Sequence, residues 1–129
     1  MELRIPVSAG ELLDKISILS IKEARISDGA KLANVRKELR LLQDVAEGLP
    51  IEESQLSRWL SALREVNESL WEIEDEIRAC EARREFEDPF ISLARAVYRK
   101  NDERSRIKRE INEATGSEIV EEKSYVDPK

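Results

Sequence analysis

The feature that most limits the fold is a long stretch without helix breakers, between Pro50 and Pro89. It contains neither glycine nor proline, and its apolar residues recur every three or four positions, as on one face of a helix. These residues are Leu56, Trp59, Leu60, Leu63, Val66, Leu70 and Ile77. The spacing predicts one helix over residues 52–84, about 48 Å long.

Signals for helix ends divide the remainder of the chain into three further helices. Ser8 and Glu11 have the spacing of a capping box. Gly29 suits the left-handed residue that follows a first helix, and Gly116 suits the end of the last one. Asp88, which precedes a proline, is typical of an N-cap. We therefore expect helices near residues 9–27, 30–47, 52–84 and 88–114.

These helices predict an all-α fold, a four-helix bundle that forms a single domain over residues 1–129. The helices at 52–84 and 88–114 would run antiparallel, with short extended segments at both ends of the chain. The chain has 129 residues, 40% of them hydrophobic, which is enough to bury a core. The first two helices would be only about 28 Å long, so the long pair would project beyond them. Because apolar residues on the projecting part need a cover, we expect a homodimer.

Charge and composition exclude several classes of function. The net charge is −6 and the basic residues are interleaved with acidic ones, which does not favour a nucleic-acid partner. The absence of histidine removes the commonest general base and any histidine-ligated zinc site. A lone cysteine, Cys80, cannot form an intrachain disulfide. No apolar run is long enough to cross a membrane and no signal peptide is recognisable, so we expect no membrane insertion and a cytoplasmic location.

Several polar residues lie on or beside the apolar helix faces. Six of them share the helical spacing of the leucines and isoleucines: Asn67, Glu74, Glu81, Asn101, Arg104 and Lys108. Arg78 and Asp102 lie beside these rows, and Lys22 interrupts the first helix. A charged side chain that is removed from water must be paired, bound to a metal ion or neutralised. The faces therefore predict either a polar network or a binding site.

Three interpretations of these residues remain open. The first is an internal network of salt bridges and amides. The second is a site for a phosphorylated or carboxylated metabolite, with candidate ligand-binding residues Lys22, Asn67, Glu74, Arg78, Asn101, Asp102, Arg104 and Lys108. The third is a carboxylate site for Mg²⁺, the one cofactor that the sequence suggests, with candidate ligands Glu38, Glu74, Glu81 and Asp102. No serine has a histidine partner, so no catalytic residue is assigned and the sequence does not decide whether the protein is an enzyme.

Four motifs resemble a small bacterial family known only as a domain of unknown function. They are GELLDKISIL at residues 10–19, NESLWEIEDEIR at 67–78, LARAVYRKND at 93–102 and GSEIVEEKSY at 116–125. The likeness extends over nearly the whole chain. Related domains occur beside helical-repeat and glycosyltransferase-like segments, so the resemblance implies a link to surface-polysaccharide biosynthesis. It implies no catalytic residue.

The sequence as a whole predicts a binding or assembly module, either a homodimer or a module with another protein partner. The alternative is a small ligand-binding domain or enzyme that acts on a phosphorylated or carboxylated metabolite, with or without Mg²⁺. The segment 121–125 is either a solvated tail or a lid that closes over Asn101, Arg104 and Lys108.

Overall fold

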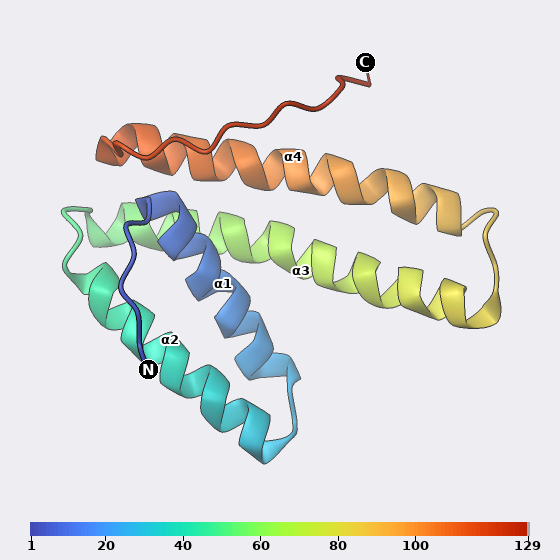
Figure 1. The fold of residues 1–129 in the computed structure, drawn as a ribbon, viewed down its shortest axis with the longest axis horizontal. Helices are drawn as coiled ribbons and strands as arrows, with labels where there is room; N and C mark the ends of the chain where they lie inside the picture. Colours follow the sequence, from blue (N-terminus) through green and yellow to red (C-terminus); the bar gives the residue numbers. More distant parts are fainter. Residues whose placement is uncertain (129) are drawn as a thin grey trace.

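The computed structural model describes residues 1–128, which form four helices and no strand. They are α1 (Ala9–Arg25), α2 (Gly29–Glu47), α3 (Glu53–Arg83) and α4 (Phe90–Thr115). Their order and antiparallel pairing are seen in Figure 1. The prediction of an all-α fold with two long helices is confirmed.

The helix ends agree with most of the expected caps. The Ser8 hydroxyl accepts a hydrogen bond from the Glu11 N–H at 3.2 Å, which begins α1. Gly116 ends α4 with φ of 66°, in the left-handed region. Two expectations were wrong. Gly29 is the first residue of α2, because the Asp28 carboxylate caps that helix instead, and α4 begins at Phe90, so Asp88 is not its N-cap.

Helix α1 is the centre of the fold. It packs against each of the other three helices, whereas α2 lies along its outer side and α3 pairs with α4. Apolar residues therefore surround α1 in nearly every direction, which matches the wide apolar arc in its sequence. The core comprises Leu12, Leu13, Ile16, Leu19, Val35, Leu39, Ala46, Trp59, Leu63 and Ile111.

The far half of the α3–α4 hairpin projects beyond α1 and α2 (Figure 1). There α3 has only α4 beside it, so one side of each helix faces solvent. Glu74 and Glu81 are exposed, and the expectation that they point into a core was wrong. They keep the spacing of the leucines, but Glu81 lies past the end of α1 at Arg25, and Glu74 lines an open hollow beside α1.

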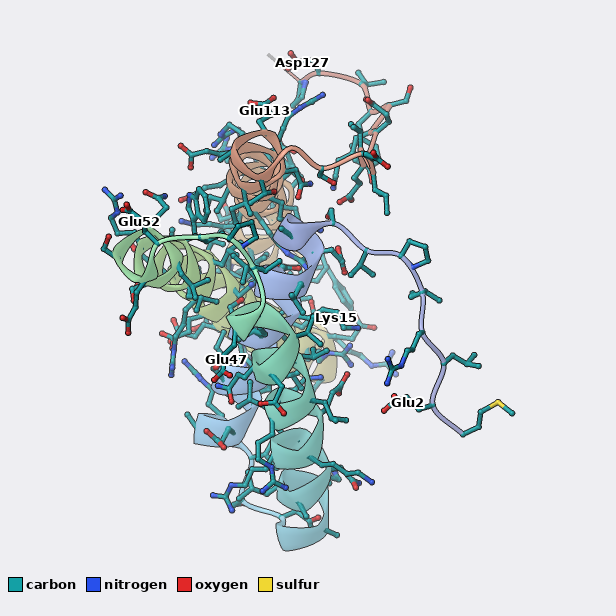
Figure 2. The ribbon with its side chains drawn as sticks, turned by 90° about the vertical axis from the view of Figure 1, so that its left-hand side faces the viewer. Glu2, Lys15, Glu47, Glu52, Glu113 and Asp127 are labelled. Carbon is teal, nitrogen blue, oxygen red and sulfur yellow. The ribbon has the colours of Figure 1, made fainter. Side chains whose placement is uncertain are left out.

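Both ends of the chain are extended. The first seven residues are exposed, and in Figure 2 the segment that carries Glu2 stands away from the helices. The segment after Gly116, here called the tail (residues 117–128), runs back along α4 (Figure 1). The tail is mostly exposed but contacts α4 through side chains described below.

Candidate functional site

A buried carboxylate lies where α1, α3 and α4 meet. Asp14 on α1 is 0% exposed, although it carries a charge in the middle of the core helix. Its Oδ1 accepts a hydrogen bond from Arg104 Nε at 3.0 Å, and its Oδ2 accepts one from Arg104 Nη2. This bidentate pair joins α1 to α4 and compensates the loss of hydration of Asp14.

Helix α3 completes the surroundings of Asp14 through an amide. Asn67 is buried, and its Nδ2 donates to Asp14 Oδ1 at 2.9 Å and to Ser17 Oγ at 2.8 Å. Ser17 Oγ in turn donates to the backbone carbonyl of Asp14 at 2.7 Å. The Ser17 hydroxyl hydrogen is thus engaged with a carbonyl, so this serine is not placed as a nucleophile.

Lys108 connects the same network to the tail. Its side chain is 10% exposed, and its ammonium donates to Glu11 Oε2 at 2.8 Å and to Glu121 Oε2 at 3.0 Å. Asp14 Oδ2 lies 4.0 Å from the same Nζ. One buried cation therefore holds carboxylates from α1 and from the tail.

The protonation of these groups follows from their partners. The hydrogen bond to Asp14 raises the pKa of Arg104 above its usual value. Burial lowers the pKa of Lys108, but hydrogen bonds to Glu11 and Glu121 more than offset this, so its pKa lies above the usual 10.5. The hydrogen bond from Lys108 lowers the pKa of Glu121. At neutral pH all three groups are therefore charged.

Close approach of α1 and α4 brings the paired side chains within reach of each other. The Gly10 N–H donates to Asn112 Oδ1 at 2.7 Å, across 102 positions of the chain. A Cβ at Gly10 would lie 2.6 Å from the carbonyl oxygen of Lys108. Only glycine at this position lets the two backbones approach so closely.

Two hollows flank the network. A groove of about 430 Å³ separates α4 from the tail, and a second hollow of about 280 Å³ lies between α1, α3 and α4. The groove is lined by Lys108, Arg109 and Lys123 and by the acids Glu113, Glu121 and Glu122. The second hollow contains Asn67, Glu74, Asn101 and Arg104, all of them predicted candidates, beside Trp71.

The remaining candidate ligand-binding residues lie elsewhere. Arg78 pairs with Glu74 at 3.0 Å on the exposed face of α3. Asp102 is exposed on the outer side of α4, where it lines a further groove beneath Tyr125. Lys22 is half-buried near the end of α1. The structure therefore gathers Asn67, Glu74, Asn101 and Arg104 at one hollow, with Lys108 in the adjoining network, and disperses the other three candidates.

The proposed metal ligands do not form a cluster. Glu38, Glu74, Glu81 and Asp102 are all exposed and lie on three different helices. Within residues 1–128, no group of three or more histidine, cysteine, aspartate or glutamate side chains is placed to hold a metal ion. Binding of Mg²⁺ stays a prediction without a geometric site.

Sequence reasoning missed the centre of the network. Asp14, Ser17 and Asn112 were not among the candidates, and Glu11 was interpreted only as a capping residue. Gly10, Asp14 and Ser17 follow one another at four and three positions, which places small and polar residues on one face of α1. On α4, Asn101, Arg104 and Lys108 have the matching spacing. That pair of polar stripes is the signal that could have located the site.

The network is fully hydrogen-bonded. Among the described side chains, no buried nitrogen or oxygen atom lacks a partner. Such an arrangement fixes the rotation of α1, α3 and α4 relative to one another and holds the tail against α4. It has the properties of a rigid scaffold beside two open hollows.

Comparison with known proteins assigns the chain to a family. The model of the Family of unknown function (DUF6165) matches residues 3–129, and the chain belongs to that family. Searches of curated proteins and of solved structures gave no match. No helix of the described chain has the length and apolar character needed to span a membrane.

Proposed function

We propose that this protein is a cytoplasmic helical binding module that assembles with a second copy of itself through the projecting half of the α3–α4 hairpin. One observation carries the proposal. Beyond the end of α1 the hairpin is only two helices thick (Figure 1). Large apolar residues there remain accessible, among them Phe86 and Ile91. A second hairpin would cover this surface.

The charges of the projecting half support a second copy as the occupant. Residues 75–83 of α3 contain three acidic and two basic residues, whereas residues 90–99 of α4 contain two basic residues and no acidic one. In a twofold-symmetric pair, the same surface of both copies meets itself. We propose the twofold arrangement in which α3 of one copy lies against α4 of the other, because it brings the more acidic helix to the basic one.

Thermal unfolding at different protein concentrations tests the assembly. Because only the folded dimer benefits from association, its melting temperature rises with protein concentration. We expect this rise for the natural protein and its loss in Ile91→Lys, since Ile91 is 49% exposed and its replacement leaves the single copy intact. Leu41→Lys is the matched control, because Leu41 is 46% exposed on α2. A melting temperature that is independent of concentration in the natural protein would rule out the assembly.

A second candidate function is the binding of a phosphorylated or carboxylated metabolite in the groove between α4 and the tail. The observation that favours it is the set of three cations along this groove, Lys108, Arg109 and Lys123. Lys108 is almost wholly buried, so its ammonium interacts strongly with an anion. This candidate is compatible with dimerisation, because the groove lies at the C-terminal end of α4. The proposed dimer surface lies at the other end of that helix.

A thermal-shift series with inorganic phosphate and malonate, each with and without Mg²⁺, tests this candidate. A ligand at 100 times its Kd stabilises the folded state by about 2.7 kcal/mol. We expect a shift that weakens in Arg109→Gln and Lys123→Gln but persists in Lys37→Gln, whose lysine is exposed on α2. Absence of any shift over the series would argue against a small-anion site.

The pathway is proposed on the family resemblance alone. Because similar domains occur beside glycosyltransferase-like segments, we place the module in bacterial surface-polysaccharide biosynthesis. Loss of surface polysaccharide in a strain that lacks the gene, restored by the natural chain, is the expected outcome. An unchanged amount of surface polysaccharide in that strain would show that the protein is not required for this pathway.

A further inference from the structure

The tail is attached to the network by one charged contact to a buried group. Glu121 Oε2 accepts a hydrogen bond from Lys108 Nζ at 3.0 Å. The other acceptors near Nζ, Glu11 and Asp14, belong to α1 and lie on the inner side of α4. Glu121 is therefore the carboxylate that reaches Lys108 from the side of the groove.

This contact shows which chemical group the groove accepts at Lys108. A carboxylate oxygen on an exposed, extended segment lies within hydrogen-bond distance of a lysine whose side chain is 10% exposed. We propose that the groove between α4 and the tail is a carboxylate-binding site, that Glu121 occupies it in the free protein, and that a small dicarboxylate displaces Glu121 and releases the tail. The proposal rests on the second candidate function above and adds its ligand class and its coupling to the tail.

The charge at Lys108 allows one carboxylate to replace another. The groove is lined by three cations and three acids while Glu121 is in place. When Glu121 leaves, Lys108 keeps Glu11 of α1 as a partner and loses its acceptor on the groove side, which an incoming carboxylate replaces charge for charge. A second carboxylate of the ligand can then reach Arg109, the next residue of α4, whose side chain is 62% exposed on the rim. This is the reason to expect a dicarboxylate rather than a single acid.

Glu121 competes as a tethered ligand. It lies 13 positions from Lys108 in the chain. Its effective concentration at the ammonium is therefore in about the millimolar range, as for a ligand attached by a short flexible linker. The ion pair between Glu121 and Lys108 is weak, because the Glu121 side chain is 52% exposed to solvent. A free ligand with two contacts can overcome such a competitor.

An NMR titration with malonate tests the exchange in the full-length protein. We compare the natural chain with Glu121→Gln, which removes the competitor, and with Glu122→Gln, which removes the same charge from the same groove. Malonate should bind Glu121→Gln about three- to fivefold more tightly than the natural chain, the factor expected for a half-exposed ion pair. Glu122→Gln should resemble the natural chain. Inorganic phosphate serves as a second probe, and malonamide as the uncharged control.

Trypsin cleavage after Lys123 gives an independent measure of tail release. We expect malonate to accelerate this cleavage in the natural chain, and Glu121→Gln to be cleaved rapidly without it. Equal tightening in both glutamine variants would mean that net charge alone acts, and would overturn the exchange. Binding with the same Kd in the natural chain and Glu121→Gln would also overturn it while leaving the anion site intact. No binding in any variant would overturn both the site and the inference.

Discussion

Asp14 and Arg104 are separated by 90 positions in the chain and form a bidentate ion pair at the junction of three helices. The carboxylate is fully buried, whereas the Arg104 side chain is 29% exposed. The arginine therefore links a charge in the core to the solvent-accessible hollow between α1, α3 and α4. This pair explains why a polar network can persist inside a small helical protein.

Replacement of Asp14 by asparagine should destabilise the fold. The variant leaves Arg104 and Lys108 without their buried partner, and removal of one member of a fully buried pair costs about 3–5 kcal/mol. Because Arg104 is partly open to water, we expect about 2–3 kcal/mol, measured as a lower urea midpoint. Asp75→Asn, an exposed position on α3, is the control and should change little. An Asp14→Asn protein as stable as the natural chain would show that the network is not structural.

Gly10→Ala should separate α1 from α4. The added methyl group would lie 2.6 Å from the Lys108 carbonyl oxygen and 2.7 Å from Asn112 Oδ1, so one backbone has to move. We expect a loss of about 1–3 kcal/mol in the free energy of unfolding, the range for overpacked sites. Gly29→Ala provides the comparison, since nothing lies within 4 Å of its Cβ position. A neutral Gly10→Ala would contradict the close approach of the two helices.

The contribution of Glu121 to stability should depend on pH in a defined direction. Its pKa in the folded protein is lowered by Lys108, so its stabilising effect is present above the unfolded value of about 4.5 and is lost as the pH falls through the lower folded value. The charged groups that act on it are Lys108, Lys123 and Arg104. The melting temperatures of the natural chain and Glu121→Gln should thus differ at neutral pH and converge as the pH falls through the lowered pKa of Glu121 in the folded protein. A difference that persists in acid would assign the effect to packing.

At alkaline pH, the stability of the fold should depend on Lys108. Its folded pKa lies above the usual 10.5, so the stability that it confers is complete below that value and is lost as the pH rises through the folded pKa. Circular dichroism at increasing alkaline pH should show the natural chain losing stability above about pH 10.5. If stability were unchanged there, the ammonium would not be the form that holds Glu11 and Glu121.

The helices could be predicted because their ends carry local signals. Ser8 and Gly116 act within a few residues of themselves, and the spacing of apolar residues such as Leu63 and Val66 needs no knowledge of the rest of the fold. The error at Gly29 arose because one short turn offers two signals: a glycine that can end the first helix and an aspartate, Asp28, that can cap the next one. Asp28 caps the following helix, which leaves the glycine inside it.

The centre of the site could not be predicted in the same way. Asp14 lies within the wide apolar arc of α1, and its partners Asn67 and Arg104 are 53 and 90 positions away. Their meeting depends on the rotation of three helices about their axes, which periodicity does not determine. Conversely, Glu81 has the spacing of a buried residue but lies past the end of α1, so its burial depended on the length of a different helix.

The central proposal is that a second copy covers the projecting hairpin, and the molar mass in solution tests it most directly. Size-exclusion chromatography with light scattering should be run on the natural chain at micromolar concentration, with Ile91→Lys beside it. The account predicts twice the 14.9 kDa of one chain for the natural protein and the mass of a single chain for the variant. A mass of 14.9 kDa for the natural protein would contradict it.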